Sequence, residues 1–79
     1  MTLEEVFEKV RTMIADQLEL NAADITMDTN IIEDLQADSL DFVELITDIE
    51  DEFDIVVTDE KVGDFKTVRQ VVEFLHEQL

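Results

Sequence analysis

Side chains that could carry covalent or metal chemistry are scarce in this sequence. It contains no Cys, its single His is His76 near the C-terminus, and it has no Gly-rich loop of the kind that cradles phosphates. Thiolate nucleophiles, zinc clusters and Ser-His-Asp triads therefore lack their usual residues. Ser39 has no candidate base nearby in the sequence, so we do not expect its hydroxyl to act as an activated nucleophile. We expect no catalytic residue, no enzymatic activity and no dedicated metal site.

Carboxylates dominate the chemistry that remains. The 79 residues include 22 Asp plus Glu but only five Lys plus Arg, which gives a formal net charge of −17. Residues 12–60 concentrate the imbalance, because they hold 16 of the 22 acids and no Lys, Arg or His. Such a charge argues against binding to nucleic acid and to anionic membrane surfaces, and it favours protein partners with basic patches.

Four acids of this stretch recur at spacings of three, four and three: Asp41, Glu44, Asp48 and Asp51, which we name the acidic face. In a helix this spacing places them on one side, without the cations at i+4 that relieve repulsion on ordinary exposed helices. The acidic face is interpreted either as a solvated surface or as a recognition surface for a basic partner. The cost of holding like charges together favours recognition.

The same carboxylates do not form a calcium-sensor loop. A loop that started at Asp48 would have Phe53 at its sixth place and Asp59 at its twelfth. The EF-hand needs Gly and Glu at these two places. Specific calcium sensing is therefore not expected, although loose divalent binding that relieves repulsion is compatible with the sequence.

Apolar residues at helical spacing predict the elements that position these groups. Hydrophobic residues make up 46% of the chain, which favours a folded domain over acidic disorder. Capping boxes at Thr2-Leu3-Glu4-Glu5 and Thr67-Val68-Arg69-Gln70 mark two helix starts. Four helices are predicted: Leu3 to about Asp16, an N-cap at Asp38 followed by helix to about Asp54, Thr58 to about Gly63, and Thr67 onward. The predicted apolar faces are Leu3, Phe7, Val10 and Ile14, then Phe42, Ile46, Ile49 and Phe53, then Val68, Val71 or Val72, Leu75 and Leu79.

A long connection separates the first two predicted helices. Residues 21–37 lose the helical period, and we expect Ile25, Ile31, Ile32 and Leu35 to pin this loop to the core. The sequence thus predicts an all-α fold: a four-helix bundle of three longer helices and one short helix, in a single domain over residues 1–79. No apolar run is long enough for a membrane span or a signal peptide, so we expect a soluble, cytoplasmic protein.

Ser39 lies in the first turn of the second predicted helix, between Asp38 and Leu40. Ser is common at helix starts for purely structural reasons. A helix N-terminus is also where a covalently attached phosphate is favoured, because free amides and the helix dipole face it. Ser39 is therefore a candidate for modification by another enzyme.

The segment Leu35-Gln36-Ala37-Asp38-Ser39-Leu40-Asp41, followed by Val43-Glu44-Leu45 and Glu50-Asp51-Glu52-Phe53, resembles the acyl carrier proteins of dissociated (type II) fatty acid synthesis. The resemblance extends over nearly the whole chain. It implies that Ser39 carries covalent 4′-phosphopantetheine, whose thiol holds growing acyl chains as thioesters. It also implies that the partners are a phosphopantetheinyl transferase and the fatty acid synthesis enzymes, which dock through basic patches.

Two further sets of residues follow from this resemblance. The implied partner-binding residues are Asp38, Leu40, Asp41, Val43, Glu44, Glu50 and Asp51. The implied acyl-pocket residues are Leu45, Ile46, Ile49, Val57, Val62 and Phe65, each of which a hydrophobic core explains equally well. We expect a monomer that neither binds nucleic acid nor inserts into a membrane.

Three positions depart from the family pattern. Gln36 stands where the family usually has Gly, Thr47 replaces an apolar contact of many members, and Phe42 is bulkier than usual. A specialised polyketide-type carrier is an alternative within this class. An acidic helical protein-binding module without a cofactor is the alternative from another class.

Overall fold

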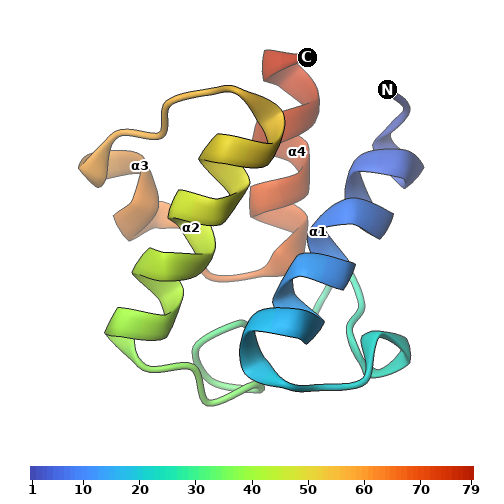
Figure 1. The fold of residues 1–79 in the computed structure, drawn as a ribbon, viewed down its shortest axis with the longest axis vertical. Coiled ribbons are helices and arrows are strands. Elements are labelled where there is room, and N and C mark those ends of the chain that lie inside the picture. Colours follow the sequence, from blue (N-terminus) through green and yellow to red (C-terminus); the bar gives the residue numbers. More distant parts are fainter.

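The computed structural model describes all residues from 1 to 79, and it is all-helical (Figure 1). Its elements are α1 (Leu3–Leu18), the 3₁₀ turn η1 (Ala22–Asp24), α2 (Ser39–Phe53), α3 (Asp59–Asp64) and α4 (Val68–Gln78). The predicted class, with three longer helices and one short one, is confirmed. None of these helices has the length and apolar character needed to cross a membrane.

Side-chain caps define where the helices begin. Thr2 and Glu5 form a reciprocal capping box at the start of α1, and Thr67 and Gln70 form the second one at the start of α4. The hydroxyl of Thr58 accepts a hydrogen bond at the start of α3. Each cap satisfies backbone amides that have no partner within the helix. The hydrogen bond that Glu5 accepts from the backbone amide of Thr2 also lowers the pKa of its carboxyl.

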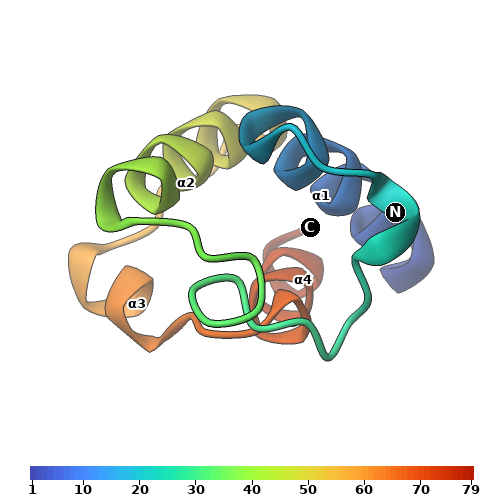
Figure 2. The same cartoon turned by 90° about the horizontal axis from the view of Figure 1, so that it is seen from below.

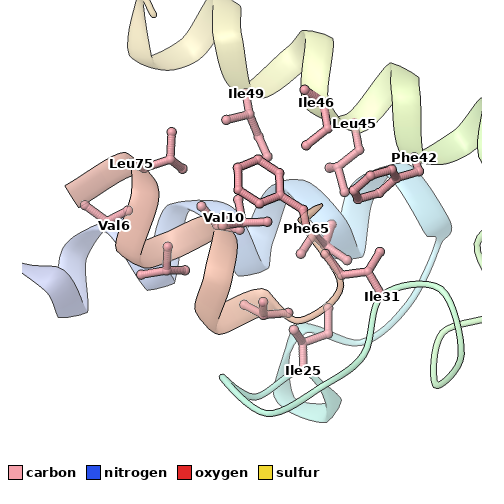
Figure 3. Packing of buried hydrophobic residues seen from close by; sticks show 14 of the residues in the cluster. Val6, Val10, Ile25, Ile31, Phe42, Leu45, Ile46, Ile49, Phe65 and Leu75 are labelled. Carbon is pink, nitrogen blue, oxygen red and sulfur yellow. The ribbon is translucent and has the colours of Figure 1, made fainter. Parts of the chain in front are cut away.

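The core lies between α1, α2 and α4, which surround a common interior in Figure 2. Val6 and Val10 of α1, Ile49 of α2 and Leu75 of α4 meet there (Figure 3). Phe65, from the segment between α3 and α4, reaches toward the side chains of α2. The core therefore joins residues from both ends of the chain.

The predicted apolar face of α1 was partly wrong. Leu3 is 39% exposed and Phe7 is only half-buried, whereas Val6 is completely buried. The buried face of α1 is centred on Val6, Val10 and Ile14, because this helix packs against both α2 and α4. Leu79, the last residue of the predicted face of α4, is likewise exposed.

The connection over residues 19–38 is joined to the start of α4 by backbone hydrogen bonds. Ile31 N–H donates to the carbonyl of Lys66 over 2.9 Å, and Val68 N–H donates to the carbonyl of Thr29 over 3.0 Å. Arg69 N–H donates to the carbonyl of Met27 over 2.8 Å. The loop therefore supplies acceptors to amides in the first turn of α4 that would otherwise lack partners.

Buried side chains hold the same connection to the core. Ile25 and Ile31 are completely buried, as predicted, whereas Leu35 is half-buried and Ile32 is exposed. Arg11 of α1 donates from Nε to the carbonyl of Ala22, which fixes η1. The connection is thus an ordered part of the fold.

Gln36 turns the chain toward α2 in a left-handed backbone conformation, with φ of 55°. A side chain on Cβ makes this conformation unfavourable, whereas Gly adopts it freely. Ala37, the next residue, is buried and holds the turn against the core. Because residue 36 is Gln rather than Gly, a strained residue lies three positions before Ser39, the first residue of α2.

Shortening Ile49 by one methyl group tests the packing of the core. Ile49 is 1% exposed, so Ile49→Val is expected to lower the free energy of unfolding by about 1 kcal/mol. Val56→Ala is the control, because Val56 is 82% exposed and its truncation should change stability by less than about 0.5 kcal/mol. Equal shifts of the urea midpoint for the two variants would contradict the packing described for α2.

Replacing Gln36 by Gly tests the strain in the turn. Gln36→Gly is expected to raise the free energy of unfolding by up to about 1 kcal/mol, because the left-handed backbone no longer carries a Cβ. Gln36→Ala removes the rest of the side chain but keeps Cβ, so it should give no such gain. Urea denaturation of the three proteins provides the comparison, and a gain in the Ala variant equal to that in the Gly variant would exclude backbone strain as the cause.

Candidate functional site

Ser39 is the first residue of α2, and Asp38 serves as the N-cap of that helix. The carboxylate of Asp38 accepts a hydrogen bond of 2.8 Å from the backbone N–H of Asp41. The cap is therefore complete without the Ser39 hydroxyl. Ser39 is exposed, and its hydroxyl forms no hydrogen bond with the protein.

Ser39 is also the only Ser of the chain, and there is no Tyr. The other hydroxyls belong to seven Thr residues, and every one of them is hydrogen-bonded. Three are helix caps, two bond the carbonyl one turn earlier in a helix, and Thr26 and Thr29 bond each other. Ser39 thus presents the one hydroxyl that has no competing partner within the protein.

An open hollow lies beside Ser39, between the start of α2 and the segment around α3. The Ser39 hollow is lined by Ile32, Ala37, Ser39, Phe42, Val43, Val62, Gly63, Phe65 and Lys66. Its walls are mostly apolar, and they come from the long connection, from α2 and from the segment around α3. Lys66 is the only cation in the lining.

The predicted acyl-pocket residues divide between this hollow and the core. Val62 and Phe65 line the hollow. The other four are buried among the core side chains: Leu45, Ile46, Ile49 and Val57. Figure 3 labels the first three of them. Five lining residues were not predicted as site residues from the sequence: Ile32, Ala37, Phe42, Gly63 and Lys66. Ile32 and Ala37 lie close to the Ser39 motif in the sequence, whereas no sequence pattern relates Lys66 to Ser39.

The predicted partner-binding residues lie along α2 and at its cap. Leu40 is 68% exposed and Val43 is 53% exposed, so the first turns of α2 present apolar side chains to solvent next to Ser39. Glu44 and Asp51 are exposed, and Asp41 is partly exposed.

Two of the predicted partner-binding acids also have bonds within the fold. Glu44 accepts a hydrogen bond of 3.0 Å from the side chain of Gln17 on α1. Glu50 accepts one of 2.9 Å from the backbone N–H of Val57, which ties the end of α2 to the following loop.

The acidic face has no cations paired to it. The three ion pairs of the structure are Lys9–Glu52, Arg11–Glu8 and Arg69–Asp28, and none includes a member of the face. The last pair raises the pKa of the Arg69 guanidinium, chiefly through its hydrogen bond to Asp28. No group of acidic or His side chains converges in a geometry that could hold a metal ion. The face is therefore a row of exposed or partly exposed carboxylates without cationic partners.

Comparison with known proteins gives consistent results over most of the chain. A family model described as "Phosphopantetheine attachment site" matches residues 8–75. The acyl carrier protein of Clostridium acetobutylicum is 50% identical over 70 residues, which cover 89% of this chain and 91% of that protein. The acyl carrier protein of Clostridium perfringens is 47% identical over 72 residues, which cover 91% of this chain and 95% of the relative. The solved structure of the acyl carrier protein from Enterococcus faecalis superimposes with a TM-score of 0.84 at 34% identity, and the match covers 100% of both chains.

The residues around α2 fit the group that this family attaches. An exposed and unbonded hydroxyl is available, and it opens on a hollow with apolar walls and one ammonium group, which suits an arm with a phosphate at one end. When bound, 4′-phosphopantetheine supplies the thiol that this Cys-free chain lacks. The chain belongs to the acyl carrier protein family, whose members bear covalently attached 4′-phosphopantetheine and act as carriers rather than as enzymes.

Proposed function

We propose that Ser39 is the attachment residue and that the protein delivers growing acyl chains, held as thioesters on the arm, to fatty acid synthesis enzymes. The observation that carries this proposal is the unbonded Ser39 hydroxyl at the start of α2. A modifying enzyme can reach it without breaking a helix cap, since Asp38 supplies the cap. The family match over residues 8–75 supports the attachment of the same group to this chain.

The partner surface in this proposal is the exposed side of α2. It comprises Asp38, Leu40, Asp41, Val43, Glu44, Glu50 and Asp51. Leu40 and Val43 offer apolar contact beside Ser39, while the carboxylates farther along the helix attract basic patches on the transferase and the synthesis enzymes. Such charges mainly increase the rate of encounter and set the orientation of docking.

We also propose that the Ser39 hollow is where the acyl chain enters the protein. Val62 and Phe65 would line the entrance, and Leu45, Ile46, Ile49 and Val57 would lie deeper. These four are already packed in the core, so a long chain can enter only if core side chains or α3 move. That residues 1–79 act as one domain is supported by their single hydrophobic core. A monomeric state and a cytoplasmic location stay predictions.

Replacing Ser39 tests the attachment residue directly. Protein without the arm is incubated with a phosphopantetheinyl transferase and coenzyme A, and its intact mass is measured. The wild type is expected to gain the mass of one arm, and Ser39→Ala is expected to gain none. Thr47→Ala, which removes another hydroxyl of α2, should load normally. A wild type whose mass does not change would contradict the proposal and would favour the cofactor-free binding module.

Reversing charges on α2 tests the partner surface. Glu44→Lys with Asp51→Lys is expected to lower the kcat/KM of arm loading by roughly tenfold and to weaken its dependence on salt, because two exposed attractions become repulsions. Glu73→Lys with Glu77→Lys on α4 is the matched control, since it also raises the net charge from −17 by 4, to −13. Equal losses in both double variants would mean that total charge, rather than a surface on α2, governs docking.

A further inference from the structure

Lys66 differs from every other Lys and Arg of the protein. The two arginines and Lys9 form ion pairs with carboxylates, and Lys61 lies over an aromatic ring, 5.4 Å from its centroid. Lys66 makes neither kind of contact. In a chain with 22 acids, an ammonium group without a partner is unexpected, and this one lines the Ser39 hollow.

The backbone of Lys66 is held on both sides. Its N–H donates to Oε1 of Gln70 over 2.7 Å, and its carbonyl accepts from Ile31 N–H over 2.9 Å. The side chain therefore starts from a fixed point on the wall of the hollow, while its ammonium group stays available. Binding a ligand to such a group requires little reorganisation, because the backbone is already ordered.

A phosphodiester on Ser39 would be stabilised further by a nearby cation. It adds a negative charge next to the carboxylate of Asp38, at the start of a helix with no Lys or Arg in its sequence. Lys66 is the only cation that lines the same hollow. A charge-assisted contact between an ammonium group and a phosphate oxygen is among the stronger hydrogen bonds in proteins.

We propose that Lys66 binds the phosphodiester of the arm on Ser39 and so holds the start of the arm against the wall of the hollow. This inference rests on the function proposed above. It assigns to the segment between α3 and α4 a direct contact with the arm. The contact would compensate part of the repulsion that loading creates beside Asp38.

Lysine signals in nuclear magnetic resonance spectra test the contact. The chain has three lysines, so protein labelled with ¹³C at lysine Cε gives three signals. Loading of Ser39 is expected to move the signal of Lys66 and to leave those of Lys9 and Lys61 in place. The phosphorus-31 signal of the loaded protein is expected to shift in Lys66→Gln, to keep its position in the control Lys61→Gln, and to stay near the wild-type position in Lys66→Arg.

The intact mass of each sample separates the two ways of failing. Loaded protein in which the Lys66 signal does not move would overturn the Lys66 contact and leave the Ser39 proposal standing. Protein that gains no mass would overturn both. Equal shifts at Lys61 and Lys66 would also overturn the contact, because they would report a general change of the α3 region.

Discussion

The backbone hydrogen bonds between residues 27–31 and 66–69 are the interaction on which the candidate site depends. A helix that begins in the interior leaves amides without partners, and here the carbonyls of Met27 and Thr29 accept from the first turn of α4. The reverse bond, from Ile31 to the carbonyl of Lys66, closes the pairing. These bonds bring the long connection against the segment that follows α3. The walls of the Ser39 hollow, which come from both segments, are therefore fixed by main-chain contacts rather than by side-chain packing alone.

Electrostatic repulsion opposes this arrangement. The chain carries a net charge of −17, and only three ion pairs relieve it, all between exposed or partly exposed side chains. Exposed ion pairs contribute little to stability, on the order of 0 to 1 kcal/mol each. Burial of the apolar side chains must therefore offset both the conformational entropy and the repulsion. The members of the acidic face, which have no cationic partners, stay solvated on the outer side of α2, where water and salt screen them.

Local features of this fold could be predicted from the sequence, and non-local ones could not. Caps such as Thr67 with Gln70 depend on side chains three residues apart, so their pattern is visible in the chain itself. Val6 was missed because its burial depends on α1 packing against two helices at once, which helical spacing alone does not reveal. The position of Ser39 at the start of α2 follows from its neighbour Asp38. The approach of Lys66 to the same hollow depends on the pairing of two distant segments, and no residue type or spacing marks it.

The engagement of every Thr hydroxyl, together with the absence of Cys, limits how much cargo one molecule can carry. With the arm attached at Ser39 as proposed, the chain would acquire one arm and one thiol, and each molecule would hold a single acyl group at a time. The number of acyl groups that such a carrier can hold at one time is then set by the number of carrier molecules, because each molecule has one site. A thiol reagent would then count the molecules whose arm carries a free thiol and no acyl group, because the polypeptide itself has no Cys.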